Sequence, residues 1–257
     1  IQGWGGSGID LVGCHQGVVQ NCHFEGLPGF RTKNAMQIKG GSKEVLVQQC
    51  VFINAGERAI NIGGNTGEAY FRPQGAAYEA AHVIVAGNKF IGGEAHIAWV
   101  TSRQTHVHHN IFYLPEKFVG RILQETKNPG FVPSQKGLFE ANLVVTDNRL
   151  RTYINTGVNT MPDTFTFLAN AWYRFDSDEK PGLPTPEING IYNVYPDLVH
   201  FGTARMAIGS SAPEFQHIGS EAYIPWKVPN GFDDIRIPDI KEVATPARKQ
   251  LFPVQPA

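Results

Sequence analysis

A single sequence unit recurs six times in this chain, and that repeat limits the fold more than any other feature. In each unit apolar and polar residues alternate, an Asn or Cys follows, and a large apolar residue stands two positions later, as in Val107-His108-His109-Asn110-Ile111-Phe112. The marker residues are Cys22, Cys50, Asn88, Asn110, Asn142 and Asn170, at intervals of 28, 38, 22, 32 and 28 residues. Period-two alternation predicts strands, and repetition at intervals of roughly 20–50 residues predicts a solenoid of stacked coils.

A second set of predicted strands lies ahead of the markers. They are Ile9-Asp10-Leu11, Met36-Gln37-Ile38, Ile60-Asn61-Ile62, Ile97-Ala98-Trp99, Arg121-Ile122-Leu123 and Tyr153-Ile154-Asn155. In the first four, the flanking apolar residues point inward, so Asp10, Gln37, Asn61 and Ala98 form a row on one outer face. Which residues of the last two strands face inward stays open. Asn markers at one corner are expected to hydrogen-bond from coil to coil, and the aromatic residues that follow them to stack inside.

Composition excludes few functions. The 22 Lys and Arg nearly balance the 23 Asp and Glu, so net charge gives no reason to expect nucleic acid as a partner. No stretch is apolar enough to span a bilayer. Three cysteines are an odd number, which disfavours a disulfide framework, and we expect Cys22 and Cys50 to stack as buried thiols.

We expect residues 1–220 to form an all-β, single-stranded parallel β-helix of six regular coils and an irregular last coil. The Pro-rich residues 221–257 are expected to pack along its outside as a cap, since an open solenoid end exposes strand edges. The chain starts at Ile1 without an initiating Met and enters a strand almost at once. We therefore expect a fragment or processed product whose N-terminal coils are missing, and the oligomeric state stays open.

The repeat pattern over roughly residues 8–175 resembles the pectin-lyase-like superfamily of right-handed parallel β-helices. The segments Lys39-Gly40-Gly41-Ser42, Gly63-Gly64-Asn65-Thr66-Gly67 and Tyr70-Phe71-Arg72-Pro73 look like a set of bacterial β-helix proteins often suspected of acting on polysaccharides. The resemblance implies a right-handed helix and a secreted, periplasmic or cell-surface location. It also implies a polysaccharide or oligosaccharide partner, although fold alone does not give the chemistry.

Long intervals between strands place two insertions, between Ile62 and Val83 and between Leu123 and Leu138. Both follow the second strand set, so they should stand close together, with the short coil of His96 between them. We expect a ligand site here. Candidate catalytic residues are Lys39, His96, Arg121 and Arg58, and candidate substrate-binding residues are Gln37, Asn61, Tyr70, Arg72, Glu79 and Glu125.

These residues fit β-elimination on an acidic polysaccharide, which needs a base and a cation that neutralises the substrate carboxylate. Lyases that cleave alginate and dermatan sulfate use a Lys in one coil, an Arg in the next and a calcium. Lys39 resembles that lysine, but Asn61 stands where the arginine is expected, and Arg58 lies three residues earlier. No paired Glu precedes Lys39, so no cofactor is assigned, and calcium stays an alternative without identifiable ligands.

Three alternatives stay open. A non-catalytic carbohydrate-binding or adhesin-like β-helix would use the same groove. A glycoside hydrolase would need two carboxyl groups, for which Glu79 and Glu125 are the candidates. A structural solenoid would bind nothing. We assign no metal ligands, because the spacing of His106, His108 and His109 turns one of them to the other strand face.

Overall fold

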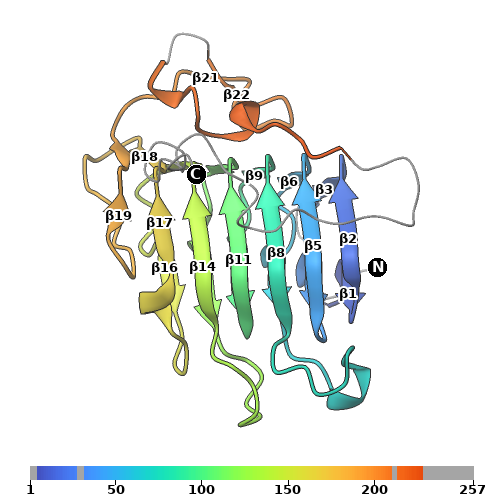
Figure 1. Ribbon diagram of the computed structural model, residues 1–257. Coiled ribbons are helices and arrows are strands. Elements are labelled where there is room, and N and C mark those ends of the chain that lie inside the picture. Colours follow the sequence, from blue (N-terminus) through green and yellow to red (C-terminus); the bar gives the residue numbers. More distant parts are fainter. Residues whose placement is uncertain (1–4, 28–31, 210–212, 228–257) are drawn as a thin grey trace, which may run out of the picture.

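The computed structural model describes residues 5–27, 32–209 and 213–227 and shows a parallel β-helix (Figure 1). Most coils contribute one strand to each of three sheets, and every pairing within these sheets is parallel. The first sheet contains β1 (Ser7–Val12), β4 (Asn34–Lys39), β7 (Arg58–Gly63), β10 (Ala95–Val100), β13 (Phe118–Leu123) and β16 (Ile154–Thr156). The described residues hold no α-helix, so the all-β prediction is confirmed.

Two further sheets complete each coil. The second contains β2 (His15–Gln20), β5 (Ser42–Gln48), β8 (Ala80–Ala86), β11 (Ser102–His108), β14 (Gln135–Glu140), β17 (Thr166–Leu168) and β19 (Glu187–Ile188). The third contains β3 (His23–Glu25), β6 (Val51–Ile53), β9 (Lys89–Ile91), β12 (Ile111–Tyr113), β15 (Leu143–Thr146), β18 (Ala171–Arg174) and β20 (Ile191–Tyr192). The short β19 and β20 form an irregular last coil.

The marker asparagines line up along one corner of the helix. The backbone N–H of Asn88 donates to Asn110 Oδ1, that of Asn110 to Asn142 Oδ1, and that of Asn142 to Asn170 Oδ1, each at 2.9 Å. Each side-chain amide also donates to a carbonyl of the preceding coil, such as Asn110 Nδ2 to Val85 O at 2.9 Å. These bonds satisfy turn groups that burial would otherwise leave without partners. The predicted register is therefore confirmed.

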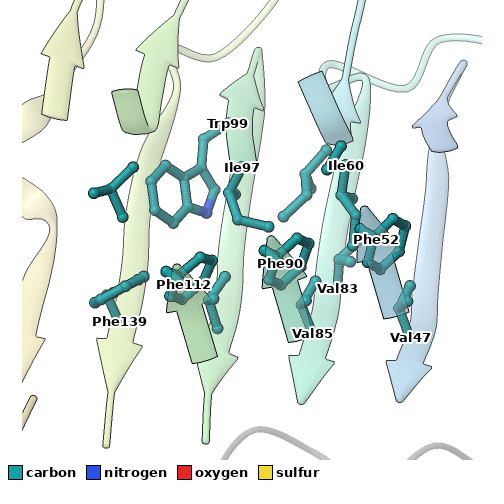
Figure 2. Close-up of a cluster of buried hydrophobic side chains, with 14 of the residues drawn as sticks. Val47, Phe52, Ile60, Val83, Val85, Phe90, Ile97, Trp99, Phe112 and Phe139 are labelled. Carbon is teal, nitrogen blue, oxygen red and sulfur yellow. The ribbon is translucent and has the colours of Figure 1, made fainter. Parts of the chain in front are cut away.

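Aromatic side chains stack from coil to coil inside the helix. Four of them follow their marker by two positions as expected, but the fifth, Phe139, lies on β14 ahead of Asn142, and Val144 takes the expected position. Successive ring centroids of Phe24, Phe52, Phe90, Phe112 and Phe139 are 4.7, 4.8, 4.9 and 5.3 Å apart. These distances are close to the spacing of about 4.8 Å between paired strands. Figure 2 shows four of these rings in a row, with Trp99 packed above them in the interior.

The outer row of the first sheet extends further than the sequence shows. Asp10 pairs in register with Gln37, Gln37 with Asn61, and Asn61 with Ala98. Arg121 pairs with Ala98, and Asn155 with Arg121. The two strands whose phase the sequence left open therefore continue the same row over all six coils.

The two insertions pack against each other. The first insertion (residues 64–79, with η1 at Glu68–Tyr70) follows β7, and the second insertion (residues 124–134) follows β13. Val132 donates its backbone N–H to Ala77 O at 2.8 Å, and the rings of Phe71 and Phe131 meet edge to face at 5.2 Å. Both loops leave the same end of the strands (Figure 1). Their predicted proximity is confirmed.

The chain after the last coil returns along the outside. Beyond η2 (Pro162–Thr164) and the irregular coil come antiparallel β21 (Leu198–Val199) and β22 (Ala207–Ile208), then η3 (Pro213–Phe215) and η4 (Ser220–Ala222). Tyr223 and Trp226 then pack on Leu46, Ile84 and Ala86 of the second sheet. Most of the predicted tail, residues 228–257, lies outside the described residues. Within the described part, no helix has the length and apolar character to cross a membrane.

Candidate functional site

A groove of about 350 Å³ hollows the outer face of the first sheet over its first three coils. Strands β1, β4 and β7 supply Asp10, Gln37, Lys39, Arg58 and Asn61 to its walls and floor, and the two insertions supply Asn65 and Glu125. Five predicted site residues therefore meet in one place, namely Gln37, Lys39, Arg58, Asn61 and Glu125. Stacking in register, not closeness in the chain, brings them together.

The floor of the groove is a chain of amide groups. Gln37 Oε1 accepts hydrogen bonds from Asn34 Nδ2 at 2.8 Å and from Asn61 Nδ2 at 3.2 Å, while Gln37 Nε2 donates to Asp10 Oδ1 at 3.4 Å. Asn34, Gln37 and Asn61 are all buried. Because these polar groups bind one another, the floor is fixed before any ligand arrives.

Two ion pairs border this floor. Lys39 Nζ lies 3.2 Å from Asp10 Oδ2, and Arg58 Nη2 lies 2.7 Å from Glu125 Oε1. Arg58 also donates through Nη1 to Asn61 Oδ1 at 2.9 Å, which holds its guanidinium over the row. With Lys33, the lining residues include three cations against two carboxylates. The groove therefore has a surplus of positive charge and suits an anionic ligand.

Arg121 lies two coils beyond Asn61 along the same row and does not line the groove. Its Nε donates to Asn155 Oδ1 at 3.1 Å, and its guanidinium lies 5.0 Å from the centroid of the Phe118 ring. Burial lowers the pKa of Arg121, and the charge of Arg58 lowers it further, against the opposing effect of Glu125. Arg121 therefore adds positive charge next to the groove without forming its wall.

His96 does not lie beside the outer face, and this predicted position is wrong. Its ring lies inside the helix, with centroids 5.7 Å from those of Phe90 and Phe112, and its Nε2 bonds to Gly92 O at 2.8 Å. Burial lowers the pKa of His96 to about 4. Strand β10 begins at a corner of the helix, where side chains no longer alternate between the inside and the outside. Both His96 and Ile97 are therefore buried. His96 cannot act as a base on a ligand in the groove.

Glu79 is also misplaced by the sequence interpretation. Its carboxylate has no solvent exposure and accepts four hydrogen bonds from surrounding chain segments. It therefore cannot touch a substrate, which corrects its predicted binding role. The burial of Glu79 also excludes Glu79 and Glu125 as the two carboxyl groups of a glycoside hydrolase, because both groups must reach the scissile bond.

Tyr70 and Arg72 lie on the first insertion but do not line the groove. Tyr70 is 69% exposed. The Arg72 guanidinium turns back on its own loop, where Nη1 donates to Phe71 O at 2.6 Å and Ala69 O at 3.1 Å. The conformation of the insertion, which the sequence pattern does not encode, sets both positions.

Five groove residues were not among the site candidates from the sequence: Gly6, Ser7, Lys33, Asn34 and Asn65. Asp10 was placed in the outer row, but its ion pair with Lys39 was not expected. The two residues sit on neighbouring strands, where Val12 rather than Asp10 is the register partner of Lys39. Such a diagonal contact can be found only when the register is known.

His106 and His108 of β11 and the following His109 form a separate buried cluster at the second sheet. His106 Nε2 lies 2.8 Å from Glu140 Oε2, and both side chains are fully buried. Burial lowers the pKa of His109 to about 4 and holds that of His108 well below its ordinary value. Among the described residues, no group of three or more His, Cys, Asp or Glu side chains is arranged to hold a metal ion.

The fold and the groove together define a class of protein: a parallel β-helix with a charged groove on the outer face of one sheet. No protein-family model, curated protein or solved structure matches the chain. The particular function therefore has to be argued from the chemistry of the groove itself.

Proposed function

We propose that the groove binds a segment of an acidic polysaccharide and that the protein cleaves it by β-elimination, as a polysaccharide lyase-like member of the pectin-lyase-like superfamily. One observation carries this proposal. Lys39 and Arg58 come from adjacent coils and line the same groove, which has a surplus of positive charge. The resemblance to bacterial β-helix proteins adds the proposal that the protein is bacterial and works outside the cytoplasm.

In such a reaction each of the two basic residues has a distinct task. Arg58 holds the substrate carboxylate through paired hydrogen bonds and stabilises the negative charge that develops on it. Lys39 acts as the neutral amine, after its ammonium group has lost a proton to solvent, and removes the proton from the carbon next to that carboxylate. The bond from the neighbouring carbon to the glycosidic oxygen then breaks, a carbon–carbon double bond forms, and the Lys39 ammonium returns the proton to the leaving oxygen. No water is consumed.

The ion pairs of the groove describe its resting state. A substrate carboxylate replaces Glu125 at Arg58, and entry of the sugar ring separates Lys39 from Asp10. Both pairs are partly exposed, with side-chain exposures of 19% and 35% for Arg58 and Glu125. Exposed ion pairs contribute only about 0–1 kcal/mol, so an incoming anion exchanges them at little cost.

The second candidate is a carbohydrate-binding protein without catalysis. The same ion pairs favour it, because Lys39 and Arg58 each already have a carboxylate partner. Such a protein would bind the anionic polymer through this groove and leave it intact. Hydrolysis is less well supported, because the two carboxyl groups of the groove, Asp10 and Glu125, are both engaged by cations.

The test incubates the protein with alginate, pectate and glycosaminoglycans and follows the ultraviolet absorbance of an unsaturated product, with binding measured in parallel. Lys39→Gln should abolish product formation and keep part of the binding. Lys43→Gln is the matched control, since Lys43 is a partly exposed lysine on β5 outside the groove that pairs with Glu44. Binding without product across the whole panel would favour the second candidate. Neither binding nor product would reject both.

A further inference from the structure

Glu79 is the last residue before β8, and its buried carboxylate joins three separate segments of the chain. Oε2 accepts the Gly40 backbone N–H at 2.8 Å and the Thr66 hydroxyl at 2.7 Å. Oε1 accepts the Thr66 backbone N–H at 2.8 Å and the Thr126 hydroxyl at 2.7 Å. One side chain thus binds the turn after β4, the start of the first insertion and the start of the second.

Each of these donors is the chain neighbour of a groove residue. Gly40 follows Lys39, Thr66 follows Asn65, and Thr126 follows Glu125. We propose that Glu79 is a positioning residue that holds Lys39, Asn65 and Glu125 in one arrangement around the groove. This inference rests on the proposed function of that groove and deepens it, because Glu79 acts on the ligand only through its neighbours.

The arrangement requires a carboxylate. Each Glu79 oxygen accepts one backbone N–H, from Gly40 or from Thr66, in addition to a hydroxyl. A threonine hydroxyl can turn and accept a hydrogen bond, but a backbone N–H can only donate. A glutamine in either orientation would therefore place its NH₂ group against one of these N–H groups. A buried donor left without an acceptor costs about 1–3 kcal/mol.

The segments themselves explain why such a connection is needed. Gly40, Gly41 and Gly63 have φ angles of 67°, 84° and 108°, which side-chain-bearing residues rarely adopt. Glycines offer no side chain for packing, so apolar contacts cannot fix these turns. Burying a carboxylate among neutral donors carries a large desolvation free energy. Such an unfavourable burial is typical of positions that serve a functional site rather than stability.

The experiment compares Glu79→Gln with Glu140→Gln. Glu140 is a matched control, because it is another fully buried carboxylate, lies on β14 outside the groove and binds His106. We expect Glu79→Gln to speed backbone hydrogen exchange together at Gly40, at Thr66 and in residues 124–127, and to leave the strands protected. Its affinity for a hexamer of galacturonate or mannuronate, measured by calorimetry, should fall about tenfold or more, and that of Glu140→Gln should not.

Three results would overturn the inference: loosening of only one segment, joint loosening with unchanged affinity, or an equal loss of affinity in Glu140→Gln. If the wild-type protein binds neither hexamer nor any polymer of the panel above, the proposed function fails, and exchange alone decides whether Glu79 holds the three segments. If Glu79→Gln does not fold, Thr126→Val replaces it. Thr126→Val removes one donor and should loosen residues 124–127 while sparing Gly40.

Discussion

Arg58 and Glu125 are 67 residues apart in the chain, yet Arg58 Nη2 lies 2.7 Å from Glu125 Oε1 on the outer face of the first sheet. Arg58 begins β7, and Glu125 belongs to the second insertion, two coils further along. The pair stands at the edge of the groove. Among the described residues, none from β10 or β13 lines the groove. The pair therefore separates the groove from Arg121.

Glu125→Gln tests this ion pair. We expect it to strengthen the binding of acidic oligosaccharides about two- to tenfold at low salt, because Arg58 loses a competing carboxylate and the groove loses a negative charge. The melting temperature should hardly change, since a partly exposed pair contributes about 0.2–1 kcal/mol. Calorimetric titration at two ionic strengths measures the effect, and added salt should reduce it. Weaker binding would instead mean that Glu125 contacts the ligand.

Asn110→Ala tests the asparagine ladder. Asn110 Oδ1 accepts the Asn88 N–H, and Nδ2 donates to the carbonyls of Val85 and His108, all within the buried corner. Alanine leaves these groups without partners, so we expect a loss of about 2–4 kcal/mol in the free energy of unfolding. Urea denaturation measures this loss. Gln74→Ala, at an exposed position of the first insertion, should change the free energy by less than about 0.5 kcal/mol. A mild effect of Asn110→Ala would show that water can replace the ladder.

His96→Phe tests the buried histidine. Burial lowers the pKa of His96 from about 6.5 to about 4, so between these values the unfolded chain binds a proton that the folded protein does not. Stability due to His96 is therefore lost as the pH falls from 6.5 to 4. Urea unfolding at pH 7 and pH 5 should show a smaller loss for His96→Phe than for the wild type, by about 1–3 kcal/mol. Equal losses would mean that His96 does not titrate in this window.

Glu187→Gln tests the opposite dependence of stability on pH, at the end of the asparagine ladder. Glu187 accepts the Asn170 backbone N–H at 3.0 Å and Trp172 Nε1–H at 2.9 Å, and burial raises its pKa to about 7. Between its ordinary value of 4.5 and about 7, the folded protein holds a proton that the unfolded chain has released. The wild type should therefore lose stability relative to Glu187→Gln as the pH rises from 4.5 to 7, by about 1–3 kcal/mol. Thermal melts at these two pH values measure the difference. A constant difference would contradict the shift.

Part of the candidate site followed from the sequence, and part did not. Gln37 and Asn61 could be placed because strand alternation assigns each residue to a face, and Lys39 because it lies two positions beyond Gln37. His96 was misplaced because alternation fails at the corner where β10 begins. Glu79 was misplaced because the direction of an insertion side chain depends on three loops folding together.

By itself, the sequence determined the solenoid, its register and most of the stacked aromatic interior, because a coil that repeats must bury the same positions against its neighbours. Only the tertiary structure decided how the corners turn. The residue before every marker is left-handed, including Gln49, His109 and Ala141 with φ of 52°, 53° and 51°. Gly87 and Asn21 favour that conformation locally, but Gln49 and Ala141 do not, and hydrogen bonds from the adjacent coil stabilise it there. The same holds for the groove, whose ion pairs join residues that meet only when distant coils stack.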